Sequence, residues 1–204
     1  MHEAALPPEP ERSITLIQVE AMALVLGSTQ PADSVDVDAC RRHGIEVVRR
    51  RSGGGAVLVG PGEVLWVDVV LPRSDALWTD DVSHSSRWLG EAWSAALGDV
   101  GVAGGTTHAG ALVCRRWSGA VCFAGLAPGE VTVGARKAVG IAQRRSRGGA
   151  RFQCAVPRAW RPTLMTELLG LDDRATADLT DIVHVVPPAA ASALFDALVA
   201  RLPG

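Results

Sequence analysis

The run of residues 64–71, Val-Leu-Trp-Val-Asp-Val-Val-Leu, constrains the fold more than any other stretch of the chain. It is rich in β-branched residues, follows a Gly-Pro-Gly turn and stops at Pro72, so it predicts a long strand. Shorter runs of this kind recur through the middle of the chain, whereas helical patterns cluster at its end. This order predicts an α+β domain whose mixed or antiparallel sheet is flanked by helices.

The remaining elements are predicted from periodicity and from turn residues. An apolar stretch over residues 13–27 predicts a short helix or strand that leads into a buried strand. Further strands are predicted over residues 45–48, 111–114, 119–123, 131–133, 139–142, 152–156 and, as a small strand, 182–186. Helices are predicted over residues 33–42, 80–98, 163–169 and 189–202, and residues 101–110 are predicted to form a loop.

Length and composition narrow the class of protein. A chain of 204 residues fits one domain, and a net charge of −2 argues against a broad basic surface for nucleic acid. No apolar run reaches the roughly 18 residues of a membrane helix, and the start lacks the features of a signal peptide. The proline- and acid-rich residues 1–12 predict a loose N-terminal arm before a single domain over 13–204.

The cysteines indicate a reducing environment. Cys40, Cys114, Cys122 and Cys154 are widely scattered and form no CxxC motif, which argues against a zinc site and against a disulfide scaffold. We therefore expect no metal site and a cytoplasmic location with free thiols. From the charge and the apolar runs described above, we also expect no membrane partner and no nucleic-acid partner.

The segment Arg49–Val57 places three arginines and a serine directly before three glycines. Glycines let a backbone approach a ligand closely, and exposed N–H groups beside guanidinium groups suit a carboxylate or a phosphate. A glycine hairpin with a solvated basic edge is the alternative. The segment lacks the Gly-Lys-Ser/Thr ending of a P-loop.

Lys137 is the only lysine in the chain; every other cationic side chain is an arginine. Lysine carries a compact charge on a flexible stem, whereas arginine is a planar fork. A lysine kept among small residues at 134–143 indicates a tight site that holds a phosphate or an acyl oxygen. The alternative is a solvated surface lysine.

Three segments resemble the lipoate–protein ligase A family, within the wider group of biotin and lipoate ligases and octanoyltransferases. They are Leu26–Gln30, Val47–Val57, and Arg136–Gln143 followed by a basic, glycine-bearing turn. Their order and spacing match over about residues 13–200. The resemblance implies a biotin/lipoate ligase-like catalytic domain, of the class II synthetase-like type, without the C-terminal accessory domain of many ligases.

The ligase branch implies attachment of a lipoyl or octanoyl group to a lysine on the lipoyl domain of another protein. There, ATP with Mg²⁺ converts lipoate or octanoate to an acyl-adenylate, and the acceptor lysine displaces AMP. Lys137 would bridge the acyl carbonyl and the phosphate, where a compact cation suits a mixed anhydride. The other matching positions would line the acyl and adenylate pocket: Arg50, Ser52, Gly53, Gly54, Gly55, Ala56, Gly140 and Ala142.

The octanoyltransferase branch needs no ATP and no other cofactor. A cysteine takes the octanoyl group from acyl carrier protein as a thioester and passes it to the acceptor lysine. In one subgroup this cysteine precedes a phenylalanine, an acidic residue and the lysine motif, as Cys122, Phe123, Glu130 and Lys137 do here. The alternative is that Cys122 is a small buried hydrophobic residue. The ligase route comes first because the triple-glycine segment is ligase-like.

The chain also departs from the ligase pattern at three places. Ligases usually carry a His-Asp pair and Gly-Asn after the triple glycine, His-Gly after the second basic turn and Asn-Asp before the lysine. These places hold residues 58–63, Gln153-Cys154 and Gly129-Glu130 here. The replacements keep open a third class of function, a catalytically weak homologue that binds acyl groups or a carrier protein.

Overall fold

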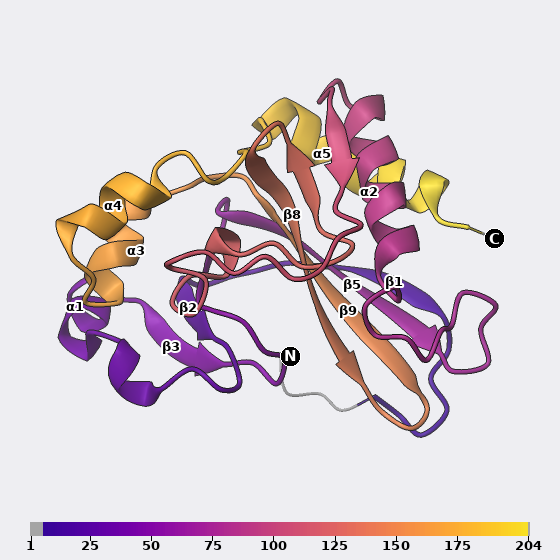
Figure 1. The fold of residues 1–204 in the computed structure, drawn as a ribbon, viewed down its shortest axis with the longest axis horizontal. Coiled ribbons are helices and arrows are strands. Elements are labelled where there is room, and N and C mark those ends of the chain that lie inside the picture. The colour runs from indigo at the N-terminus through magenta and orange to yellow at the C-terminus, as the bar shows by residue number, and fades with distance from the viewer. Residues whose placement is uncertain (1–5, 204) are drawn as a thin grey trace.

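The computed structural model describes residues 6–203 of the chain. Its larger sheet has the strand order β1-β5-β9-β8-β7-β6, and every neighbouring pair is antiparallel (Figure 1). The strands are β1 (Ser13–Ile17), β5 (Val64–Pro72), β6 (Gly105–Thr107), β7 (Val131–Val133), β8 (Arg136–Arg145) and β9 (Gly149–Pro157).

A smaller sheet lies beside the first and is mixed. Its central strand β2 (Ala23–Leu26) runs parallel to β3 (Glu46–Arg49) and antiparallel to β4 (Val57–Val59). The predicted α+β class with mixed and antiparallel sheets is therefore confirmed.

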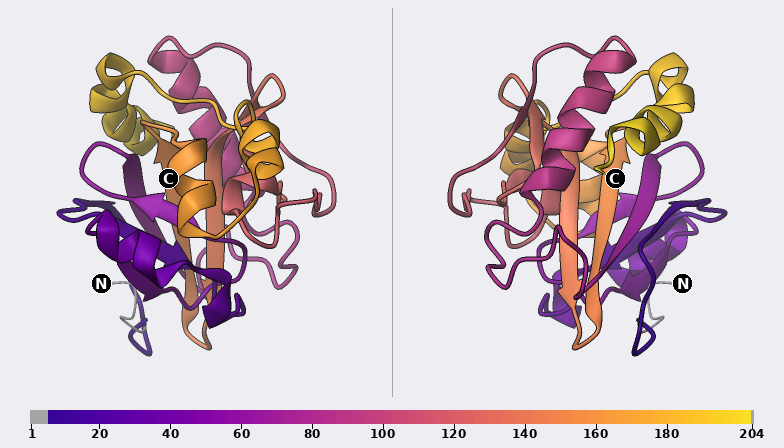
Figure 2. Two further views of the ribbon diagram at one scale, coloured as in Figure 1. Left: turned by 90° about the vertical axis from the view of Figure 1, so that its left-hand side faces the viewer. Right: turned by 90° about the vertical axis from the view of Figure 1, so that its right-hand side faces the viewer.

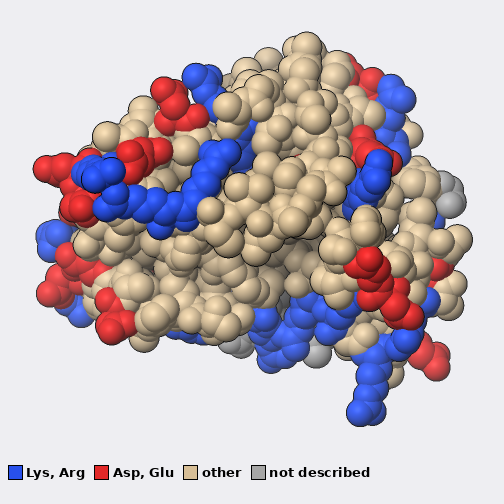
Figure 3. Space-filling view, in the orientation of Figure 1, with Lys and Arg blue, Asp and Glu red and all other residues tan. Residues whose placement is uncertain are grey.

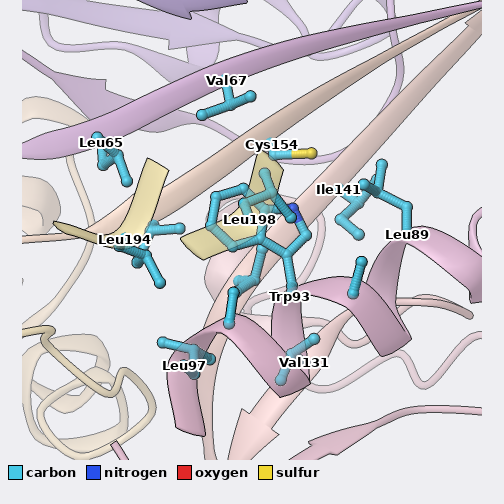
Figure 4. Close-up of a cluster of buried hydrophobic side chains, with 14 of the residues drawn as sticks. Leu65, Val67, Leu89, Trp93, Leu97, Val131, Ile141, Cys154, Leu194 and Leu198 are labelled. Carbon is cyan, nitrogen blue, oxygen red and sulfur yellow. The ribbon is translucent and has the colours of Figure 1, made fainter. Parts of the chain in front are cut away.

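The helices form two groups at opposite ends of the molecule (Figures 1 and 2). Helices α2 (Arg87–Asp99) and α5 (Pro188–Arg201) share a core with the larger sheet, while α1 (Val37–Arg42), α3 (Pro162–Leu168) and α4 (Asp173–Leu179) share one with the smaller sheet. Trp93 of α2 stands at the centre of the larger core, among Leu89, Leu198 and Cys154 (Figure 4). Its complete burial fixes one face of the larger sheet against the helices.

The space between the two sheets follows from side-chain alternation along β2. Leu24 and Leu26 pack toward α1 and α3, whereas Val25 between them packs with Trp66 of the larger sheet. Successive residues of a strand point to opposite faces. The face of the smaller sheet that carries Val25 therefore lies against the face of the larger sheet that carries Trp66. The candidate site lies in this space.

Several predicted elements need correction. The helix predicted over 80–98 begins only at Arg87, because the Asp81 carboxylate accepts hydrogen bonds from Ser83 and contacts His84, which holds residues 80–86 in turns. The helix predicted over 33–42 is a 3-10 turn at Ala32–Ser34 followed by the shorter α1.

The strands predicted at 111–114 and 119–123 are wrong. Val113 makes only an isolated bridge to Leu126, and Cys122 begins the 3-10 turn Cys122–Ala124. The predicted strand near 182–186 is reduced to a bridge between Val183 and Lys137. The prediction missed α4, and it assigned β6 to a loop.

The predicted N-terminal arm falls partly on residues 1–5, outside the described residues. Within the described part, Pro10 is buried and Arg12 donates a hydrogen bond to the carbonyl of Pro203. Among residues 6–203, no helix has both the length and the apolar character needed to cross a bilayer.

Candidate active site

A narrow pocket lies between the two sheets. The smaller sheet contributes Val25 and Val57, and the larger sheet contributes Trp66, Gly140 and Ala155. The pocket is also lined by Arg50, Cys122, Phe123, Ile141, Ala142 and Gln153. Its walls are mainly apolar, so it suits a hydrocarbon chain.

A wider cleft of about 420 Å³ adjoins this pocket. The glycine-rich segment Ser52–Gly55 lines it, as do Glu130 and Lys137, and the loop of residues 112–119 contributes Cys114 and Arg115. Charged side chains lie mostly around the edges of the face shown in Figure 3, which is hollowed near its centre.

Cys122 lies where the pocket and the cleft meet. It lines both spaces, together with Ile141 and Ala142 of β8. The backbone N–H of Cys122 donates to Ala56 O over 3.0 Å, and Ala56 N–H donates to Ala120 O over 2.7 Å. These two bonds tie the cysteine to the glycine-rich segment.

Lys137 and Glu130 form a buried ion pair beside Cys122. Their side chains are each only 4% exposed, and Nζ lies 2.7 Å from Glu130 Oε2. Nζ also donates to the carbonyls of Cys122 and Gly125, each over 3.1 Å. An ammonium group has three N–H donors, so all three of Lys137 have acceptors within the protein.

Glu130 is held as firmly as its partner. Its Oε2 accepts from Ala127 N–H over 2.7 Å, and its Oε1 accepts from Ile141 N–H over 3.1 Å. A buried charge pair needs such extra hydrogen bonds to offset its desolvation. The pair therefore joins β8 to the turn that carries Cys122.

Arg50 is the second buried cation of the site. Its Nη2 donates to Gly53 O over 2.7 Å and to Gly55 O over 2.9 Å, and its Nη1 donates to Val25 O over 3.2 Å. Within the described residues it has no carboxylate partner, and its Nε has no acceptor.

Arg50 sets the direction of the glycine peptides. The N–H of Gly54 points opposite to the Gly53 carbonyl of the same trans peptide, and so away from the guanidinium group. Within the described residues, neither the N–H groups of Gly53, Gly54 and Gly55 nor the buried Ser52 Oγ has a hydrogen-bond partner. The segment, whose residues line the cleft, therefore has backbone donors that are free within the described residues.

Glycine is required where this segment meets Cys122. A Cβ on Gly55 would lie 2.6 Å from the backbone N of Val121, and Gly54 has a φ of 97°. A Cβ on Gly54 would lie 3.7 Å from Cys122 Sγ. A side chain is therefore excluded at Gly55 by the backbone of Val121, and at Gly54 it is disfavoured by the positive φ rather than by the sulfur.

Comparison with known proteins agrees with this arrangement. A family model described as the lipoyl protein ligase A/B catalytic domain matches residues 4–187. The chain belongs to this family.

Two curated relatives are octanoyltransferases named LipM. The chain is 30% identical to that of Clostridioides difficile (strain 630) over 57% of this chain and 42% of the relative. It is 28% identical to that of Exiguobacterium sp. (strain ATCC BAA-1283 / AT1b) over 74% of this chain and 56% of the relative. The chain thus spans about half the length of these relatives.

A solved structure of lipoate-protein ligase A bound with ATP has the same fold. It superimposes with a TM-score of 0.65 over 90% of this chain and 70% of that one, at 21% sequence identity. The match confirms the ligase-like fold expected from the resemblance.

Most of the residues proposed from the family motif lie together. Cys122, Lys137, Ser52 and the three glycines line the cleft, and Arg50, Gly140 and Ala142 line the pocket. Ala56 is completely buried in the core of the smaller sheet and lines neither space; its contact with the site is through its hydrogen bonds to the turn. The site role of each residue stays a prediction.

Several lining residues were missed or misplaced by sequence reasoning. The sequence gives Phe123 only as a motif neighbour, Gln153 only as a departure from the ligase pattern and Trp66 only as part of a strand, yet all three line the pocket. For Trp66 and Gln153, side-chain alternation along β5 and β9 is the available signal; Phe123 lies in a 3-10 turn, where alternation gives none. The basic turn after β8 lies at the far end of that strand from Lys137, and its Arg145 instead donates to the carbonyls of Thr79 and Asp80.

The other cysteines differ from Cys122 in their surroundings. Burial raises the pKa of the Cys154 thiol to about 12, and burial with the nearby Asp36 raises the pKa of Cys40. Both thiols therefore stay protonated and unreactive near neutral pH. Cys114 is exposed and lines the cleft, so it is a natural comparison for Cys122.

The cleft does not provide a fitting set of ligands for Mg²⁺. Among its lining residues Glu130 is the one carboxylate, and both of its oxygens are engaged. In the described part of the chain, no group of three or more His, Cys, Asp and Glu side chains is placed to hold a metal ion.

Proposed function

We propose that this protein transfers a medium-chain acyl group, octanoyl or lipoyl, to a lysine of a lipoyl domain through a thioester on Cys122. One observation carries the proposal: Cys122 stands at the junction of an apolar pocket and an open cleft. An acyl chain in the pocket would place its carbonyl at the sulfur, while a donor or acceptor would approach through the cleft.

The reaction takes two balanced steps. The Cys122 sulfur attacks the thioester carbonyl of an acyl carrier protein; the Cys122 S–C bond forms, and the carrier's thiol leaves with the proton of the cysteine. The acceptor lysine amine then attacks the new thioester, an amide forms, and Cys122 regains its proton from the amine. Neither step needs ATP.

The free donors of the glycine-rich segment suit the oxyanion of each step. The N–H groups of Gly53–Gly55 and the Ser52 hydroxyl lack partners within the described residues. Donors that are fixed before the reaction stabilise a tetrahedral intermediate without reorganisation. Lys137 has its donors engaged, so we assign it the role of positioning the Cys122 turn.

The ligase route is the second candidate, and the same segment favours it. Free backbone donors beside a serine suit an adenylate phosphate, and the ATP-bound ligase has the same fold. Two findings place this route second: Lys137 has no donor left to bridge a phosphate, and the cleft has no free carboxylate for Mg²⁺.

The deciding experiment measures the intact mass of an apo lipoyl domain after incubation with the protein. One tube contains octanoyl acyl carrier protein without nucleotide, and the other contains octanoate, ATP and Mg²⁺. We expect the acyl mass in the first tube. Its appearance only in the second would establish the ligase route, and its appearance in neither would favour the acyl- or carrier-binding homologue.

Two serine variants identify the nucleophile. Cys122→Ser should abolish transfer in the first tube and should abolish the acyl mass on the protein itself. Cys114→Ser changes a cysteine of the same cleft and should leave both intact. Equal activity of Cys122→Ser and the parent would exclude the thioester. We place this reaction in the cytoplasm, where free thiols persist.

A further inference from the structure

A second apolar pocket lies next to the narrow pocket between the two sheets that is proposed above to hold the acyl chain. Leu58, Val64, Pro157, Trp160 and Met165 contribute most of its apolar lining. The ion pair between Glu63 and Arg161, with 2.7 Å between Oε1 and Nη2, lies at one side. The mechanism above makes no use of this space.

The two pockets share Val57 and Phe123 as lining residues. Phe123 is 5% exposed, and its ring is held on several sides. It lies 6.1 Å from the ring of Trp160, and Lys137 Nζ stands 5.2 Å from its centroid. A Cβ on Gly140 would lie 3.6 Å from its Cζ. The ring is therefore a fixed partition between two apolar spaces.

We propose that Phe123, with Val57, limits the length of the acyl chain, and that the second pocket accepts the distal methylenes of longer chains once this partition is reduced. The inference rests on the proposed function and specifies its substrate. A buried methylene favours binding by about fourfold, so several methylenes in the second pocket would change chain-length preference strongly. Met165 is unbranched and can adjust its shape to such a chain.

The test is a competition in one tube among octanoyl, decanoyl and dodecanoyl donors of whichever class the parent protein uses. The mass distribution on the lipoyl domain gives the ratio of products, which does not depend on the overall rate. We expect Phe123→Leu and Phe123→Ala to raise the dodecanoyl-to-octanoyl ratio, the alanine variant by at least about tenfold. Adding Ala159→Leu to Phe123→Ala should fill the second pocket and reverse the gain.

Phe152→Leu is the matched control, because Phe152 is also buried but packs in the core of the larger sheet. It should lower stability and leave the ratio unchanged. An unchanged ratio in both Phe123 variants overturns the inference.

A measurement without turnover separates this inference from the proposed function. Free octanoate, decanoate and dodecanoate should raise the Tm of the protein, since a ligand that binds the folded state stabilises it. In Phe123→Leu the shift with dodecanoate should grow relative to that with octanoate. If the parent transfers no acyl group but this change occurs, the proposed function fails and the inference stands; equal shifts in parent and variant refute the inference itself.

Discussion

Two buried cations flank Cys122, and their surroundings differ. Lys137, on the cleft side, faces the Glu130 carboxylate at 2.7 Å and two carbonyls. Arg50, on the pocket side, donates only to carbonyls and has no carboxylate partner within the described residues. The positive charge of Lys137 is thus neutralised locally, whereas that of Arg50 is not.

We propose that this difference gives the two residues different tasks. Lys137, whose charge is neutralised and whose donors are all engaged, would hold the Cys122 turn against β8. An arginine without a counter-ion, bonded to the carbonyls of a glycine loop, orients that loop and leaves its field available. Negative charge that develops at the acyl carbonyl would then be stabilised mainly from the Arg50 side.

Removing one partner of the Lys137–Glu130 pair should have the largest effect. Lys137→Met and Glu130→Gln should each lower the free energy of unfolding by about 3–5 kcal/mol, because each leaves a buried charge without its partner. Urea unfolding measures this, and the double variant should cost less than the sum of the two. Additive losses of unfolding free energy in the double variant would show that Lys137 and Glu130 do not stabilise the fold as a pair.

The exposed pair Arg201–Asp99 is the control for this cycle. Its atoms approach as closely, at 2.6 Å, but both side chains are more than a third exposed. Arg201→Met should therefore cost less than about 1 kcal/mol. A similar loss of unfolding free energy in Arg201→Met and in Lys137→Met would contradict the argument from burial.

Arg50→Lys should separate the contribution of the positive charge of Arg50 from that of its hydrogen-bond geometry. Lysine keeps the charge but cannot donate to two carbonyls in the planar manner of arginine. We expect about 2 kcal/mol of lost stability, because carbonyls of the glycine loop lose their donor. The transfer rate should fall on the order of 100-fold as the loop donors shift.

Arg49→Lys is the matched control for Arg50. Arg49 also donates to loop carbonyls, those of Gly27 and Gln30, but it lines neither the pocket nor the cleft. It should lose some stability with little change in transfer rate. Equal rate losses in both variants would remove the special role of Arg50.

The sequence predicted that Lys137 and Arg50 belong to the site, but not which groups they contact there. The strand Val64–Pro72 was predictable, because its run rich in β-branched residues is long and bounded by turn residues. Of the strand Gly149–Pro157, only residues 152–156 were predicted. Lys137 and the glycine loop were predictable from composition and motif. The contact between Lys137 and Glu130 was not, because it depends on the turn after Cys122, where apolar residues 119–123 imitate a strand.

The same limit applies to Arg50. A run of three arginines before glycines suggested a ligand contact, yet tertiary packing turned one guanidinium inward to its own loop. Periodicity cannot distinguish these outcomes, since both keep the arginine near the site. The partition at Phe123 was equally hidden, because it forms between residues brought together from two sheets.

Gly54→Ala should have a moderate effect that sharpens the role of Arg50. Gly54 has a φ of 97°, and an added Cβ would lie 3.0 Å from Arg50 Nη2. We expect a loss of about 1–2 kcal/mol in the free energy of unfolding, from backbone strain. Gly53→Ala, where a Cβ meets nothing within 4 Å, is the control and should change stability by less than about 0.5 kcal/mol. Equal losses at the two positions would show that neither the positive φ of Gly54 nor the contact of its added Cβ with Arg50 is costly.

The smallest effect concerns His184, whose backbone N–H donates to the Lys137 carbonyl over 3.0 Å. Burial and the nearby Arg136 lower the pKa of His184 from 6.5. Because the unfolded chain binds this proton more tightly, the contribution to stability is complete above pH 6.5 and declines as the pH falls through the lowered value. Urea midpoints measured from pH 7.5 to pH 5 should therefore fall more in the parent than in His184→Asn. Parallel pH profiles would indicate that this end of the Lys137 segment does not respond to protonation, and the acid sensitivity of the fold would then arise elsewhere.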